Sequence, residues 1–100
     1  MPKKVWMIIT IDSDSRFVTT KERQERQDIL VNHGFSELSP HNGVRLPEST
    51  YIGKIPCSEA GKTKVDEIWE ELKSANLEPR RILGGIINDW KILRSKKDKD

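Results

Sequence analysis

One run of residues near the start of the chain restricts the fold more than any other feature of the sequence. Residues 5–11 read Val-Trp-Met-Ile-Ile-Thr-Ile, so apolar or β-branched side chains occupy both alternating faces. This pattern is typical of a central strand that is covered on at least one side. The run stops at Asp12, and the polar residues 12–15 predict a loop. The chain is therefore expected to fold around a sheet that contains residues 5–11.

Two segments have the composition and spacing of helices. Residues 21–33 contain good helix formers and are followed by Gly34, at a position where glycine commonly ends a helix. The second segment carries an apolar stripe at helical spacing, formed by Val65, Ile68, Trp69 and Leu72. Thr63 is placed to cap the start of this second helix, and charged residues occupy its other face.

The remaining segments favour strands. Residues 35–55 alternate between β-like stretches and turn formers, which predicts a long, bent hairpin whose second strand is 50–55. Residues 81–93 fit both a helical and a strand spacing. Their β-branched content and the pair Gly84-Gly85, which would weaken a helix, favour a strand with an additional short fifth strand at its end.

The order of these elements is strand, helix, strand, strand, helix, strand. The simplest packing for that order is an α+β fold, a ferredoxin-like βαββαβ sandwich with an antiparallel sheet and two helices on one face. One hundred residues leave room for one domain. We therefore expect a single ferredoxin-like domain over residues 1–94 and a charged flexible tail over 95–100.

Composition limits the environment and the assembly of the chain. The apolar and the charged residues each make up 34% of the sequence, so the core must be thin, and we expect a second copy to complete it in a homodimer. Cys57 is the single cysteine and has no partner for an internal disulfide. The longest apolar stretch, residues 5–9, is far too short to span a bilayer. A cytoplasmic protein without a membrane partner is expected.

Two carboxylates follow the first strand. Asp12 and Asp14 lie just past the apolar run, in a loop that can reach solvent. Mg²⁺ and Mn²⁺ prefer oxygen ligands and keep several waters, so one or two carboxylates suffice to hold either ion. In a dimer, two copies of Asp12 could hold metal near a phosphate and act catalytically. The alternative is a turn whose side chains bond to local backbone.

Four arginines are candidates for contacts to nucleic acid. Arg23 and Arg26 lie in the polar first turns of the first helix, which we expect to extend past the sheet edge. Arg80 and Arg81 form a second pair. The net charge of +2 neither demands nor excludes a nucleic-acid partner, because nucleic-acid binding depends on where the charges lie on the surface. The alternative for each group is a solvated surface.

The first third of the sequence resembles a known family. The apolar strand ends in Ile11-Asp12, and the basic helix runs into residues 29–35, Ile-Leu-Val-Asn-His-Gly-Phe. These features are similar to those of the small CRISPR-associated ferredoxin-fold proteins of spacer acquisition and of the VapD-type RNA interferases. Beyond residue 35 the resemblance extends to the order of elements. It implies a ferredoxin-like fold and a metal-ligand role for Asp12, with Asp14 outside the family pattern.

The sequence thus leads to two functional hypotheses. The first is a homodimer that handles RNA or DNA, as an endonuclease that depends on Mg²⁺ or Mn²⁺. The second is a non-catalytic module that binds a protein or a nucleic acid, because folds of this kind host many functions.

Overall fold

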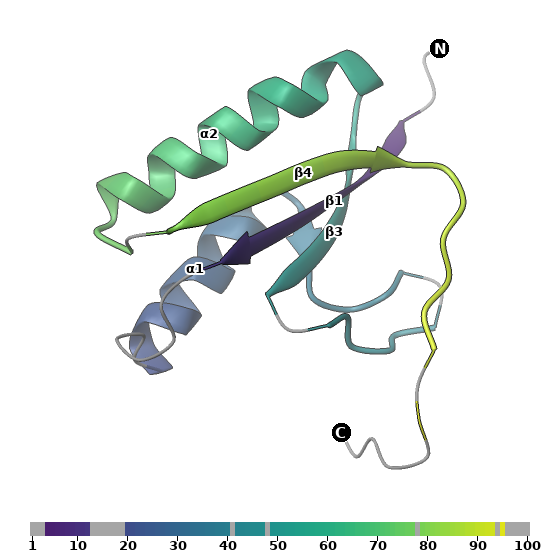
Figure 1. Ribbon diagram of the computed structural model, residues 1–100, viewed down its shortest axis with the longest axis horizontal. Helices are drawn as coiled ribbons and strands as arrows, with labels where there is room; N and C mark the ends of the chain where they lie inside the picture. The colour runs from purple at the N-terminus through teal and green to yellow at the C-terminus, as the bar shows by residue number, and fades with distance from the viewer. Residues whose placement is uncertain are drawn as a thin grey trace.

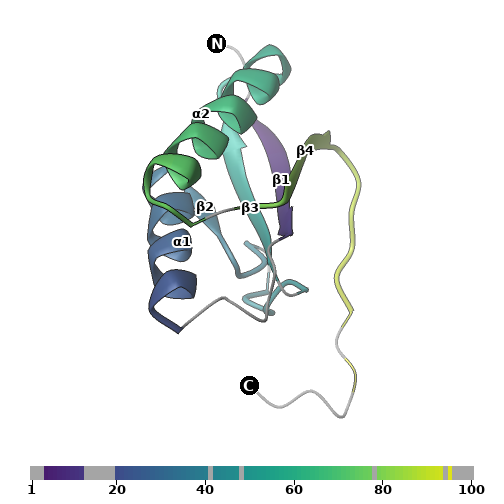
Figure 2. The same cartoon turned by 60° about the vertical axis from the view of Figure 1, so that its left-hand side comes forward.

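The computed structural model of the chain describes residues 4–12, 20–40, 42–47, 49–77, 79–93 and 95. The elements in chain order are β1 (Val5–Asp12), α1 (Thr20–Asn32), β2 (Phe35–Ser36), β3 (Thr50–Ile55), the 3-10 helix η1 (Ser58–Ala60), α2 (Gly61–Ser74) and β4 (Arg81–Ile87). Within these residues, four strands form an antiparallel sheet in the order β2-β3-β1-β4. Both helices cover one face of the sheet (Figures 1 and 2). The expected α+β, ferredoxin-like arrangement is confirmed.

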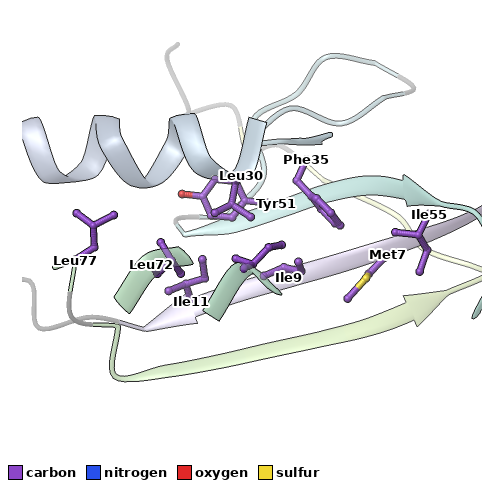
Figure 3. Packing of buried hydrophobic residues seen from close by; sticks show 10 residues of the cluster. Met7, Ile9, Ile11, Leu30, Phe35, Tyr51, Ile55, Leu72 and Leu77 are labelled. Atoms are coloured by element: carbon purple, nitrogen blue, oxygen red, sulfur yellow. The ribbon is translucent and has the colours of Figure 1, made fainter. Parts of the chain in front are cut away.

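Strand β1 lies at the centre of the sheet, between β3 and β4. Its residues Met7, Ile9 and Ile11 are at most 3% exposed and form the floor of the core beneath the helices (Figure 3). The intervening residues face the other side, because side chains alternate along a strand. The helices bury one face of residues 5–11, and the side chains of Trp6, Ile8 and Thr10 on the other face are half-buried.

Helix α1 contributes to the core only near its end. Leu30 is fully buried and Ile29 packs against the cluster, whereas the first turns are polar. The helix ends at Asn32, and Gly34 follows with a φ of 86°, a conformation that favours glycine. The predicted helix and its glycine terminus are confirmed.

Helix α2 buries the predicted apolar stripe, with Ile68 and Leu72 fully enclosed. Its predicted start was wrong. The helix begins at Gly61, directly after η1, and Ala60 holds the N-cap position without a side-chain hydrogen bond. Thr63 therefore lies inside the first turn, because η1 leads the backbone into the helix earlier than the sequence pattern indicated.

Strand β4 shows why two glycines follow each other in the sequence. Gly84 pairs with Ile9 on the face that α2 covers, and a Cβ at this position would collide with Val65 Cγ2 and Met7 Cε. Gly85 pairs with Ile8 on the opposite face, where a Cβ would have no neighbour within 4 Å. The absence of a side chain at residue 84 lets α2 approach the sheet closely.

The segment that follows β4 corrects one expectation. Residues 88–93 form no strand, so the short fifth strand is absent from the described part of the chain. A bend at Asn88 and Asp89 leads the backbone away from β4 (Figure 2). Except for Ser95, the tail expected over 95–100 lies outside the described residues. Among those residues, no helix has the length and apolar character to cross a membrane.

The connection between β2 and β3 is a smaller hairpin than the sequence suggested. Beyond Ser36, a bridge pairs Leu38 with Arg45, and hydrogen bonds run from Leu46 N to Glu37 O (2.7 Å) and from Ser39 N to Val44 O (2.8 Å). Gly43, with a φ of 69°, closes the turn. This hairpin, residues 37–46, brings Glu37 and Arg45 next to the start of β3.

Candidate nucleic-acid interface

Asp12 is the last residue of β1 and its carboxylate faces solvent. The side chain is 53% exposed and lies on the sheet face opposite the helices, in register with Arg81. Asp12 Oδ2 is 3.6 Å from Arg81 Nη1, while the Asp12 carbonyl accepts a hydrogen bond of 2.8 Å from Arg80 N–H. An exposed ion pair of this kind contributes at most about 1 kcal/mol. The carboxylate is therefore placed at the surface by the strand.

The donor chemistry at Asp12 fits a hard, hydrated cation. The described residues contain no group of three or more His, Cys, Asp or Glu side chains that could hold a metal ion. Asp14 lies outside those residues. A single carboxylate suits Mg²⁺ or Mn²⁺, which retain waters and take further oxygens from phosphates. Among the described residues, Asp12 is therefore a single exposed carboxylate, and Arg81 is its ion-pair partner.

The polar sequence of α1 predicted that Arg26 would be exposed beyond the sheet edge. The structure shows that it is not. Its side chain is half-buried, and Nη2 donates a hydrogen bond of 3.2 Å to Ser49 Oγ. The first turns of α1 pack against the segment that precedes β3, and this packing covers the guanidinium. Arg23, one turn earlier, is exposed as expected.

Tyr51 connects Arg26 to the hairpin. The residue is 1% exposed, lies beneath α1 near Leu30 (Figure 3), and its hydroxyl interacts electrostatically with both Arg26 and Glu37. Burial raises the pKa of the Tyr51 hydroxyl above its ordinary value of 10.0; Arg26 opposes this shift and Glu37 adds to it. The phenol is therefore neutral at physiological pH, so it can accept from Arg26 and donate to Glu37.

A cavity of about 470 Å³ lies beside this cluster, between α1 and the segments that lead into β3. We call it the arginine pocket. Its charged lining consists of Arg23, Arg26, Arg45 and Glu37. Neutral side chains complete the walls: Gln24, Gln27, Leu46, Pro47, Ser49 and Thr50.

Sequence reasoning missed Arg45 as a functional candidate. The residue lies in a segment rich in turn formers, where a lone arginine has no obvious meaning. The alternation Val44-Arg45-Leu46 is the signal that could have identified Arg45. In an extended segment, side chains alternate, so Arg45 faces the side opposite to Val44 and Leu46. Leu46 is buried and Arg45 is exposed in the structure, in agreement with that alternation.

The end of β1 joins the two groups of arginines. On one side, Ile11 N–H donates a hydrogen bond of 3.1 Å to the carbonyl of Ser49, whose hydroxyl holds Arg26. On the other side, Asp12 contacts Arg80 and Arg81. Figure 1 shows the start of α1, the end of β1 and the start of β4 at the same end of the sheet.

A separate polar cluster connects the two helices. His33 Nε2 is 3.3 Å from Glu71 Oε2, and His33 Nδ1 is 3.3 Å from Lys64 Nζ. A neutral imidazole satisfies both contacts when Nε2 carries the proton and Nδ1 accepts from the lysine. This cluster fastens α1 to α2 and involves none of the arginines described above.

The chain matches no model of a known protein family, no curated protein and no solved structure. The candidate interface is therefore defined by its geometry alone: five arginines and one exposed aspartate around the end of the central strand.

Proposed function

We propose that this chain binds RNA or DNA through the end of the sheet at which β1 finishes. The observation that supports the proposal is the gathering there of Arg23, Arg26 and Arg45 on one side and of Arg80 and Arg81 on the other. The five come from three parts of the sequence. Their convergence is a property of the fold, whereas the net charge of the chain is only +2.

The chemistry of arginine suits a phosphate backbone. Its planar guanidinium presents several N–H donors that match the oxygens of a phosphate, and it keeps its charge at all physiological pH values. Phosphate contacts supply most of the affinity of non-specific nucleic-acid binding. The side chains of Arg23, Arg45, Arg80 and Arg81 are exposed and accessible to a strand.

A second candidate function, cleavage of the bound strand, is favoured by the exposed carboxylate of Asp12. This aspartate would hold Mg²⁺ or Mn²⁺, and the metal would activate water and neutralise charge on the scissile phosphate. Arg81, 3.6 Å from the carboxylate, would bind a phosphate oxygen beside it. The alternative, a module that binds without cleaving, requires the same arginines and leaves Asp12 as a partner of Arg81.

The proposal includes a homodimer. The sheet face opposite the helices carries Leu83, which is 70% exposed, next to Thr10 in β1. A second copy would cover this apolar surface and place its own Asp12 near the first. Light scattering of the wild type and of Leu83→Glu tests this part: a dimer that becomes a monomer on substitution supports it, and a monomeric wild type contradicts it.

The binding test compares charge-matched variants on the same labelled strands. Arg80→Gln/Arg81→Gln removes two charges from the proposed interface, and Lys62→Gln/Lys73→Gln removes two from the exposed surface of α2. Fluorescence anisotropy with single-stranded RNA, single-stranded DNA and duplex DNA should show weaker binding for the arginine variant only. Equal losses in both variants, or no binding by the wild type, would contradict the proposal.

The cleavage test follows strand length on denaturing gels with Mg²⁺ or Mn²⁺ present. Asp12→Asn should abolish any metal-dependent cleavage while leaving the affinity for the strand within about twofold, because binding depends on the arginines. Cleavage at an unchanged rate in the variant would remove Asp12 from the mechanism. Binding without cleavage by the wild type would support the non-catalytic alternative.

A further inference from the structure

The arginine pocket has features that a general contact to a phosphate backbone does not require. Its walls come from α1, from the hairpin 37–46 and from the segment at the start of β3. It is a hollow of about 470 Å³, within the range of pockets that enclose small ligands. A backbone contact can be made on a flat surface, whereas a hollow of this size can surround a chemical group.

One residue of the lining, Arg26, is oriented by a part-buried hydrogen bond. Arg26 Nη2 donates a hydrogen bond of 3.2 Å to Ser49 Oγ, and the Tyr51 hydroxyl interacts electrostatically with Arg26 and Glu37. Tyr51 itself is 1% exposed and packed in the core. The position of the Arg26 guanidinium is therefore set before any ligand arrives, which lowers the entropy lost on binding.

The mouth of the pocket carries two more arginines with accessible side chains. Arg23 and Arg45 are both exposed, and they line the pocket from two different segments, α1 and the hairpin. No hydrogen bond or ion pair ties either side chain within the described residues. Both can close on an anion that lies above Arg26.

The charge of the lining distinguishes two kinds of phosphate. Three arginines oppose one glutamate, so the lining has two positive charges in excess. A phosphate monoester carries about −1.5 to −2 charges at pH 7 and has three terminal oxygens. A phosphate inside a strand carries a single negative charge. The monoester is the better match in charge and in the number of oxygens that face several donors.

We infer that the arginine pocket binds a phosphate monoester, the group found at the phosphorylated end of a strand and on a free mononucleotide. Arg23 and Arg45 contact its oxygens, and Arg26, which donates a hydrogen bond to Ser49 Oγ, supplies a further positive charge. This inference rests on the proposed function and narrows it, because the pocket would select strand ends, while Arg80 and Arg81 would contact phosphates along the strand.

The experiment compares one short RNA sequence with and without a terminal phosphate, at both ends in turn. The wild type should bind a phosphorylated strand at least about tenfold more tightly, as expected for one additional charge-assisted hydrogen bond. Arg45→Gln and Arg23→Gln should each reduce this preference, and the double variant should remove it. Arg81→Gln is the matched control: it should weaken binding of both strands equally and leave the preference intact. Thermal unfolding checks that every variant folds.

The outcomes separate this inference from the proposed function. Equal affinity for strands with and without a terminal phosphate overturns the inference and leaves nucleic-acid binding standing. A preference that survives the double variant also overturns it, because the phosphate would then bind elsewhere. If neither strand binds, but uridine monophosphate binds the wild type and not the double variant, the inference holds and the proposed function fails. If uridine monophosphate does not bind either, both fail.

Competition identifies the source of the phosphate when both ligands bind. A mononucleotide that displaces the phosphorylated strand at a similar concentration indicates a site for free nucleotides. Displacement only by phosphorylated strands indicates recognition of a strand end. Uridine, which lacks the phosphate, is the control. It should displace neither the mononucleotide nor the phosphorylated strand.

Discussion

The two adjacent glycines of β4 offer a sharp test of the sheet register. Gly84 faces α2, and a Cβ there would collide with Val65 Cγ2 and Met7 Cε. Gly85 faces the open side of the sheet and would meet nothing within 4 Å. The same substitution to alanine should therefore have opposite effects at two neighbouring positions.

The magnitudes follow from the contacts. Overpacking a core by one methyl group costs about 1–3 kcal/mol. The upper part of this range applies to Gly84→Ala, because Val65 is β-branched and its side chain cannot easily rotate away. Gly85→Ala should stabilise the protein by about 0.5–1 kcal/mol, because alanine loses less conformational freedom than glycine in a strand. In a domain of this size, 1 kcal/mol shifts Tm by about 4–8 °C.

Urea denaturation and thermal unfolding monitored by circular dichroism measure both effects. A double-mutant cycle adds a further check: Val65→Ala should recover part of the stability that Gly84→Ala loses, because it removes the methyl group in collision. The reasoning is refuted if both alanines have the same effect, or if Gly85→Ala is the more damaging. The second result would mean that the strand is shifted by one residue, which exchanges its faces.

Further predictions concern Tyr51 in β3 and Asp12 at the end of β1. Tyr51 is the single tyrosine, so the absorbance of tyrosinate reports directly on its hydroxyl, and the pKa should lie above 10.0. Arg26→Gln should raise this pKa further, because the positive charge that lowers it is removed. A pKa below 10.0 would contradict the burial of the hydroxyl. Because the folded state holds this proton more tightly than the unfolded state, stability should fall as pH rises above about 10. Tyr51→Phe should cost about 1 kcal/mol in urea denaturation, since Arg26 and Glu37 lose their interaction with a buried hydroxyl. Asp12→Asn should change stability by less than about 1 kcal/mol, and a larger loss would show that the ion pair with Arg81 is structural.

The long periodic segments could be predicted from the sequence, for a physical reason. Residues 5–11 form the central strand, whose side chains Met7, Ile9 and Ile11 are buried beneath the helices, and the stripe from Val65 to Leu72 follows the single face that α2 buries. The strand at 81–87 could be distinguished from a helix by its glycines. Each of these signals is local, so it does not depend on how the rest of the chain folds.

The candidate site was only partly predictable. Arg23, Arg80 and Arg81 are exposed, as charged residues usually are, but the burial of Arg26 depends on Ser49 and Tyr51, which lie more than twenty residues away in the sequence. Arg45 lines the pocket because of the register of the hairpin, which includes the bridge between Arg45 and Leu38. Such long-range contacts leave little trace in local patterns. The start of α2 was missed because η1 has no distinctive sequence signal.

The proposed function depends on contacts between the arginines at the end of β1 and the phosphates of a nucleic acid. The most direct measurement is the affinity of the wild type for single-stranded RNA over a series of salt concentrations. The slope of log K against log salt should be about −0.7 for each phosphate contacted, so contacts by three to five arginines predict about −2 to −3.5. Arg80→Gln/Arg81→Gln should reduce that slope by about 1.4. A slope near zero in the wild type would show that phosphates are not contacted and would contradict the account.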